Sequence, residues 1–323
     1  MQKLLKSNCC KYCLLILFFV MANTRLSAQT DMDAIMMSKN NFCTGFMYMG
    51  SKWDNYWEGT LKRDNQNLGT VSTNMFGMMG NYGVSGKLNL LFGVPYVKTN
   101  ASAGTLHGMS GMQDLSLWVK WMPIETKLGN GLFSVYGIGG LSFPVSNYTP
   151  DFLPMSIGLH STNLSLRGMV DYQVNNFFAT LSGTYVVRGN VKIDRTSYYT
   201  TEMHQTNEVA MPDAANFQLR TGYRSNRMIA EVIVNNWTTL GGFDITRNNM
   251  PFPSNKMNAT TAGVNIKYNL AAVEGLSLIG GGSITLAGRN MGQATSINAG
   301  VFYIFDFSKK TKKNTSPATA KNQ

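Results

Sequence analysis

The chain has 323 residues, enough for one large domain or two ordinary ones, and only 14% of them are charged. Soluble domains contain about 25% charged residues, while the mean hydropathy of −0.11 is low for a bundle of membrane-spanning helices. Of the net charge of +11, residues 1–28 carry +4 and the five lysines after Phe307 carry +5, which leaves +2 for the residues between. A nucleic-acid-binding domain would carry its positive charge on the folded domain, so this distribution argues against one.

Residues 1–28 have the pattern of a secretory signal peptide. Three lysines precede or adjoin the apolar run CLLILFFVMA, whose ten residues are too few to span a bilayer as a helix, which takes about 20. We expect cleavage after Ala28. Three of the four cysteines lie in this segment and only Cys43 follows it, so we do not expect disulfides to hold the fold together.

Segments of roughly ten residues that alternate between apolar and polar side chains recur along the chain, although 67–82, 131–144 and 275–288 are rich in Gly and Met and alternate poorly. Near the C-terminus, for example, Val264, Ile266 and Tyr268 alternate with Asn265 and Lys267. Successive side chains of a strand point to opposite faces, so this pattern predicts strands that meet a different environment on each face. The predicted strands are 42–52, 67–82, 86–98, 112–122, 131–144, 162–174, 177–191, 214–225, 227–239, 257–269, 275–288 and 294–307.

The connections between these strands alternate between long and short. The long ones are 53–66, 99–111, 145–161, 192–213 and 240–256, with a shorter one at 289–293. An even number of strands, with long loops at one end and tight turns at the other, is typical of bacterial outer-membrane barrels and places both termini in the periplasm. A soluble β-sandwich would also alternate, but it does not usually sort its loops by length.

The sequence therefore predicts an all-β fold, a single closed antiparallel transmembrane barrel of about twelve strands within residues 42–308. Residues 29–41 are expected to form a short periplasmic or plug segment. The last strand has an apolar or aromatic residue at every second position up to Phe307, which resembles the C-terminal signal that directs barrels into the outer membrane. The Lys-rich residues 309–323 are predicted to be disordered.

Two stretches of the chain, Lys87-Leu-Asn-Leu-Leu-Phe-Gly-Val-Pro-Tyr-Val97 and Gly111-Met-Gln-Asp-Leu-Ser-Leu-Trp-Val-Lys120, resemble a known family. They are similar to the outer-membrane barrels named for the meta pathway of phenol degradation, which are distantly related to the long-chain fatty-acid and aromatic-hydrocarbon transporters. The resemblance is clearest over residues 68–122, and it implies a transport barrel with apolar or aromatic compounds as candidate solutes. The larger fatty-acid transporters carry a long N-terminal hatch, for which residues 29–41 are too short.

The predicted inner face of the barrel carries more cations than acids. The candidate lumen residues are Lys87, Asp114, Trp118, Lys120, Arg167, Asp171, Arg188, Arg220, Arg224, Glu231 and Lys267. Two interpretations remain open. The charges could pair across the narrow lumen and hold the wall together, or they could form a cationic constriction that selects anions. Apolar candidates on the same face, such as Leu91, Met169 and Phe302, could line a path for apolar solutes.

An enzyme is a further possibility, because an outer-membrane phospholipase also uses a twelve-stranded barrel. His160-Ser161 is the only adjacent pair of histidine and serine, and neighbouring residues of a strand point to opposite faces. Acids of the longest loop, Asp194, Glu202 and Glu208, could bind a divalent cation, but we expect a solvated loop instead. We expect no catalytic residue, no cofactor and no metal site.

These observations predict a channel in the bacterial outer membrane for passive or facilitated uptake of small solutes, hydrophobic or aromatic ones among them. The alternative is a plugged barrel that acts in adhesion or assembly through its outer loops. The expected partners are outer-membrane lipid and lipopolysaccharide, the barrel insertion machinery and a small-molecule solute, without nucleic acid.

Overall fold

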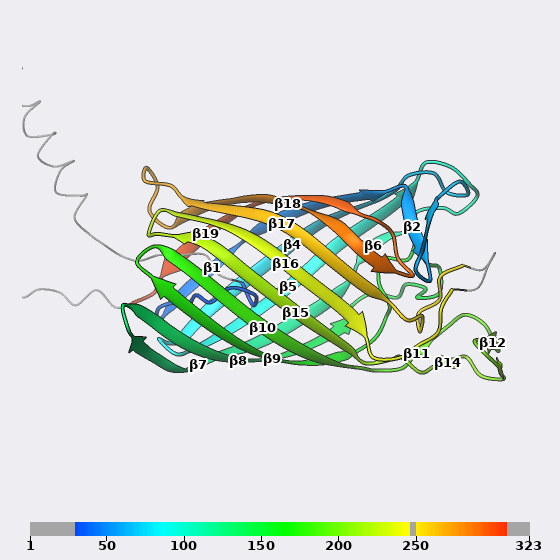
Figure 1. The fold of residues 1–323 in the computed structure, drawn as a ribbon, viewed down its shortest axis with the longest axis horizontal. Helices are drawn as coiled ribbons and strands as arrows, with labels where there is room; N and C mark the ends of the chain where they lie inside the picture. The colour runs from blue at the N-terminus through cyan, green and yellow to red at the C-terminus, as the bar shows by residue number, and fades with distance from the viewer. Residues whose placement is uncertain (1–29, 246–249, 309–323) are drawn as a thin grey trace, which may run out of the picture.

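Twelve long antiparallel strands close into one barrel in the computed structural model, which describes residues 30–245 and 250–308 (Figure 1). The strands are β1 (Asn41–Trp53), β4 (Val71–Ser85), β5 (Leu88–Ala101), β7 (Asp114–Leu128), β8 (Gly131–Pro144), β9 (Asn163–Val174), β10 (Phe177–Arg188), β15 (Ala214–Arg224), β16 (Met228–Thr239), β17 (Asn258–Asn269), β18 (Leu276–Arg289) and β19 (Thr295–Asp306). Each strand pairs with the next in this series, and β1 pairs with both β4 and β19, which closes the barrel.

The predicted fold and its twelve strands are confirmed. The largest error in a boundary is at β7, which was expected to end at residue 122 and continues to Leu128. The predicted signal peptide (1–28) and the Lys-rich tail (309–323) lie outside the described residues. In the part of the chain that the structure covers, no helix has the length and apolar character needed to cross a membrane.

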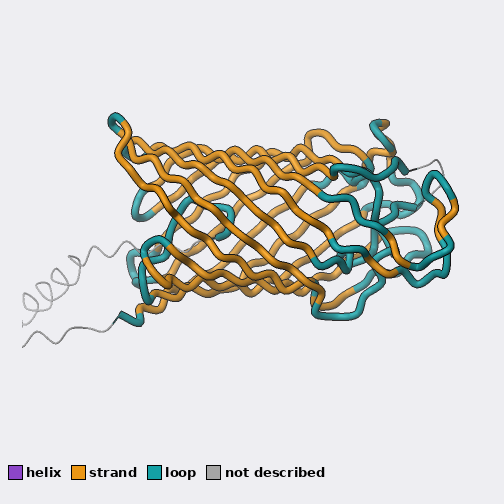
Figure 2. Tube along the Cα trace, turned by 90° about the horizontal axis from the view of Figure 1, so that it is seen from below, coloured by secondary structure: helices purple, strands orange, loops and turns teal. Residues whose placement is uncertain are grey.

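The long loops lie at one end of the barrel and the short turns at the other (Figure 2). The loops contain seven short strands that sequence alternation did not predict, because each has only two to four residues. They are β2 (Asn55–Glu58), β3 (Leu61–Asp64), β6 (Ser110–Met112), β11 (Val191–Lys192), β12 (Tyr198–Tyr199), β13 (Met203–His204) and β14 (Glu208–Val209). By analogy with outer-membrane barrels, the long-loop end faces the cell exterior and the short-turn end the periplasm.

The outer wall of the barrel is apolar. On β10, Leu181 and Tyr185 are exposed, whereas the alternate residues Thr180, Ser182 and Thr184 are buried and face the interior. An apolar surface of this extent would be unfavourable in water. It matches the lipid-facing band of a transmembrane barrel, as the alternation predicted.

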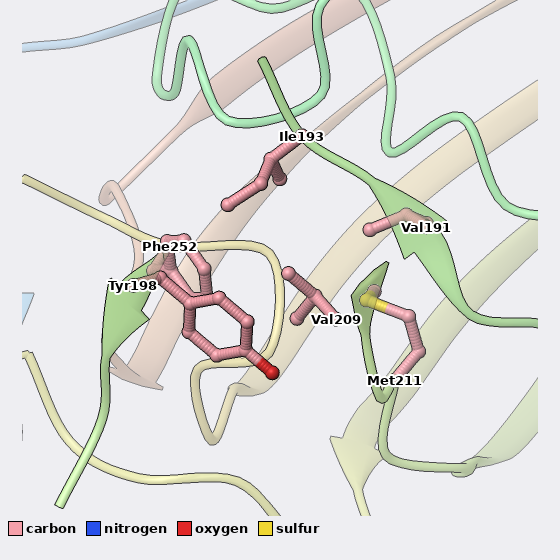
Figure 3. Packing of buried hydrophobic residues seen from close by; sticks show 6 residues of the cluster. All are labelled: Val191, Ile193, Tyr198, Val209, Met211 and Phe252. Carbon is pink, nitrogen blue, oxygen red and sulfur yellow. The ribbon is translucent and has the colours of Figure 1, made fainter. Parts of the chain in front are cut away.

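The outer loops pack together over the long-loop end. Val191, Ile193, Tyr198, Val209, Met211 and Phe252 form a buried group, called here the outer-loop cluster (Figure 3). It joins the loop between β10 and β15 to the loop between β16 and β17. A third loop, between β8 and β9, is held by Met155, which is fully buried against Leu68 and Val71 and whose carbonyl accepts a hydrogen bond from Thr99 Oγ1 (2.6 Å). These contacts fix three of the outer loops to one another or to the barrel rim.

Asp244 fixes the loop between β16 and β17 to the barrel rim. Its two carboxylate oxygens accept hydrogen bonds from Arg289 at the end of β18 (2.8 and 2.6 Å), and Oδ1 also accepts one from Asn290 Nδ2 (2.7 Å). The bonds from Arg289, followed by the one from Asn290, lower the pKa of Asp244 to about 2. The carboxylate thus stays ionised, and the loop attached, well below the ordinary pKa of an aspartate.

The first prediction concerns the lipid-facing wall. Leu181→Arg places a charge on the outer face at the middle of β10, where it should lower the free energy of unfolding by about 2–4 kcal/mol. The same change at Leu132, beside a short turn, should cost only about 0–1 kcal/mol because the cation can reach the interface. Equilibrium unfolding in lipid vesicles measures both. Equal costs at the two positions would contradict the assigned membrane depth.

The second prediction concerns pH. Because the pKa of Asp244 is lowered in the folded protein, the stabilisation that its carboxylate gives to the attached loop is fully present above the ordinary pKa of 3.8. This stabilisation weakens as the pH falls below 3.8 and is lost below about 2. Pepsin should therefore leave this loop intact at pH 3.5 and cleave it near pH 2, whereas Asp244→Asn should permit cleavage at both. Asp194→Asn, on an exposed part of another loop, is the control. Full protection of the Asp244→Asn loop would show that the carboxylate does not hold it.

Candidate functional site

Residues 30–40, called here the plug, fold into the lumen at the short-turn end of the barrel (Figures 1 and 2). Ala34 and Met37 are buried, with only 6% and 1% of their surface exposed. The backbone N–H of Asn40 donates to the carbonyl of Gly83 near the end of β4 (2.8 Å), which fixes the point where the plug enters β1. Of the two locations expected for this segment, periplasm or lumen, the structure has it in the lumen.

Side chains of the barrel bind six consecutive carbonyl oxygens of the plug, from Thr30 to Ile35. Lys120 on β7 binds three of them: its Nζ donates to the carbonyls of Thr30 (3.1 Å), Asp33 (2.5 Å) and Ile35 (2.9 Å). The other three accept from Arg167 Nη1 (Asp31, 2.8 Å), Arg220 Nη1 (Met32, 3.1 Å) and Tyr136 Oη (Ala34, 2.9 Å). The described part of the plug contains no strand or helix, so the barrel supplies the partners that buried carbonyls require.

The plug also supplies two negative charges. Asp33 Oδ1 lies 3.0 Å from Lys120 Nζ, and Asp31 Oδ2 lies 3.0 Å from Arg167 Nη1. The Lys120 side chain is completely buried. A buried charge that loses its partner costs about 3–5 kcal/mol. Within residues 30–245 and 250–308, neither cation forms a salt bridge with a carboxylate of the barrel, so the plug provides their counter-charges.

Two other cations of the lumen pair with acids of the barrel wall. Arg220 on β15 binds both carboxylate oxygens of Glu231 on the neighbouring strand β16. Arg224 binds Asp171 on β9 (2.9 Å), and its guanidinium also lies over the ring of Phe178, 3.8 Å from the centroid. The first pair joins adjacent strands and the second joins strands separated by β10, so both fix the guanidinium groups from the barrel side.

Apolar contacts hold the plug on two sides of the lumen. Met37 packs in a cluster with Cys43, Phe302 and Ile304 of β1 and β19. Ala34 packs in a second cluster, formed by Met122, Tyr136, Ile138 and Met169 of β7, β8 and β9, with Trp118 against it. A cavity of about 10 Å³ remains beside Asp31 and Trp118, which is room for about one water molecule. The plug therefore fills this part of the lumen.

The remaining candidate residues lie away from the plug contacts or need correction. Asp114 is at the outer end of β7 and accepts a hydrogen bond from Tyr148 Oη (2.7 Å). Arg188 is at the outer end of β10 and donates to the carbonyl of Pro212 (3.3 Å). Lys267 is buried on β17. Lys87 was expected on the lumen wall, but it lies on the exposed turn between β4 and β5, because the strand begins one residue later at Leu88.

The histidine and serine considered for catalysis do not form a pair. The His160 ring packs on the edge of Tyr148, with 4.8 Å between centroids, while Ser161 Oγ donates to the carbonyl of Gly189 (2.6 Å). Among the described residues, no three or more His, Cys, Asp or Glu side chains come together in a group that could hold a metal ion. The geometry of this region is that of a loop packed on the barrel.

Comparisons with known proteins identify the fold. No protein-family model and no curated protein matches the chain. Among solved structures, an outer membrane channel from Pseudomonas putida F1 is similar over 86% of this chain and 100% of that chain, with a TM-score of 0.69 and 15% identity. The fold is that of an outer-membrane channel. The translocator domain of the autotransporter NalP from Neisseria meningitidis is more distant: the TM-score is 0.43 and the identity 10%, over 85% of this chain and 90% of that one.

This similarity and the apolar outer wall confirm the expected outer-membrane barrel and its location in the bacterial outer membrane. At this level of identity the likeness shows the fold alone, so membership in the meta-pathway family stays a prediction.

The third prediction tests the anchor of the plug. Lys120→Met removes the donor to three carbonyls and the partner of Asp33, so amide hydrogen exchange in residues 30–37 should accelerate at least about tenfold, which corresponds to 1.4 kcal/mol. The same substitution at the exposed Lys87 is the matched control. Unchanged exchange in the Lys120→Met plug would mean that other contacts hold it.

Proposed function

We propose that the protein is an outer-membrane channel that admits small solutes when its plug moves. The observation that carries this proposal is that a short segment of the chain, not the barrel wall, fills the lumen, and that hydrogen bonds, ion pairs and apolar packing attach it. Such a segment can move while all twelve strands stay paired. The match to an outer membrane channel over the whole length of that protein supports the same function.

The plug contacts also explain why passage would be controlled. A hydrogen bond to a charged group contributes about 1.5–3 kcal/mol, and five of the six carbonyls are bound by Lys120, Arg167 or Arg220. Spontaneous release of the whole segment is therefore rare. A solute or another factor that offers new partners to these cations would make release easier.

Two properties of the wall bear on the solute. Leu91, Trp118 and Phe302 line the residual cavity beside the plug, which supports apolar or aromatic solutes as candidates. The cations Lys120, Arg167 and Arg220, which also bind the plug, favour polar, acidic solutes. Outer-membrane lipid and lipopolysaccharide are proposed as partners of the apolar outer wall, and the barrel insertion machinery as the partner of the last strand.

A role in adhesion or assembly is the second candidate. The observation that favours it is the outer-loop cluster, which gives the loops between β10 and β15 and between β16 and β17 a buried core of their own. A structural barrel would keep its plug in place permanently and present these loops to a partner outside the cell.

The fourth prediction separates the two functions. The wild-type protein should show low conductance in planar lipid bilayers, and a variant without residues 30–37 should show at least about tenfold more, since an open twelve-stranded barrel leaves an aqueous path. Heat-modifiable migration on a gel shows that the variant is folded. A folded variant with no greater conductance than the wild type would contradict the channel and favour the structural role.

A further inference from the structure

We propose that the lumen contains an anion-binding site that Asp31 and Asp33 occupy in the plugged state, and that this site binds a small organic dicarboxylate when the plug leaves. The inference rests on the proposed function in one respect, the movement of the plug. It goes further in assigning a ligand class to the surface that the plug covers.

The site consists of hydrogen-bond donors supplied by neighbouring strands. Lys120 on β7 and Arg167 on β9 each bind one plug carboxylate and at least one carbonyl, and Arg220 on β15 binds a further carbonyl. Tyr136 on β8 adds a hydroxyl donor. Lysine and arginine have no acceptor atom, so a ligand for this surface must be rich in acceptors. A carboxylate meets that need and also neutralises the charge.

The barrel orients two of these donors without help from the plug. Arg167 Nε donates to the Thr184 hydroxyl on β10 (2.8 Å), and Arg220 is held by both oxygens of Glu231. These bonds persist when the plug moves, which leaves Arg167 Nη1 and Arg220 Nη1 directed at the vacated space. Donors that are already oriented bind a ligand with a smaller entropic cost.

The charges that the plug supplies indicate that the ligand carries two acidic groups. Departure of the plug removes both Asp31 and Asp33, and in the described part of the chain these are the salt-bridge partners of Arg167 and Lys120. The two acids are separated by one residue, so their carboxylates reach the site from one short stretch of chain. A compact molecule with two carboxylates reproduces this arrangement. A neutral solute would leave two cations of the lumen without counter-charge, which is costly where water is scarce.

The fifth prediction uses succinate as the probe and the variant without residues 30–37 in planar bilayers. Under a gradient of potassium chloride this variant should prefer anions, and succinate should reduce its chloride current. Succinamide, which has the same carbon skeleton without the charges, should not. Adding Lys120→Met to the deletion should weaken the succinate block at least about tenfold. Lys87→Met, on the exposed turn, is the matched control and should leave the block unchanged.

Two results would overturn the inference: equal block by succinate and succinamide, or a block that persists in full in the Lys120→Met variant. Arg167→Gln in the same deletion background is the second test if Lys120→Met does not fold. A deletion variant that folds but does not conduct would contradict the channel function, not the site. The site is then tested by the unfolding temperature of that variant, which succinate should raise. When Lys120→Met is added to the deletion, succinate should no longer change the unfolding temperature. No rise with succinate would overturn the site.

Discussion

The interior of this barrel is organised by cations that have lost their contact with bulk water. Lys120 is entirely buried, and Arg167 and Arg220 are nearly so. An eight-stranded barrel is just wide enough for its own side chains to fill it, and twelve strands leave only a modest additional space. Each cation must therefore find a counter-charge or a set of carbonyl oxygens within reach. The wall carboxylates Glu231 and Asp171 satisfy part of this need, and the plug satisfies the rest.

The manner in which the plug is bound has consequences for how it could be released. The barrel mainly contacts its backbone, because six carbonyls in succession accept hydrogen bonds from the wall. Bonds to the backbone depend little on the side chains of the plug, so Asp31 and Asp33 provide most of the specific recognition. Release requires that other acceptors replace those of the plug, because bare cations in the lumen would be unstable. If the proposed function is correct, gating and ligand binding are thus two aspects of one exchange of acceptors.

The outer loops are held in place by a different kind of contact. There the loops are held by apolar packing, as in the outer-loop cluster, and by a few polar links such as Asp244 with Arg289. Solutes that reach the lumen from outside must pass between these loops. Charged groups hold much of the plug, whereas apolar packing holds most of the outer loops, so under the proposed function the two would respond to different features of a solute.

Most of the barrel could be predicted from the sequence because strand alternation is a local property. Val264 and Lys267, for example, were assigned to opposite faces of one strand from alternation alone, and the first is exposed and the second buried. The partner of Lys120 could not be predicted, because residues 30–40 have no periodicity and the side chains that bind their carbonyls lie 85 to 188 positions away in the sequence. The sequence did contain one signal for this contact: two acids, Asp31 and Asp33, come shortly before a barrel whose predicted inner face is rich in cations. Lys87 was misplaced because alternation does not mark where a strand ends.

The most direct test of this account is the distance between the Lys120 ammonium nitrogen and the carbonyl carbon of Ile35. Solid-state NMR of the protein in lipid bilayers, with ¹⁵N-labelled lysine side chains and ¹³C-labelled isoleucine carbonyls, measures it. The account predicts a strong dipolar coupling for an N···C separation of about 4 Å, as expected for a hydrogen bond to that carbonyl, and its disappearance in Lys120→Met. If the wild-type protein shows no such coupling, the plug is not held by the lumen cations.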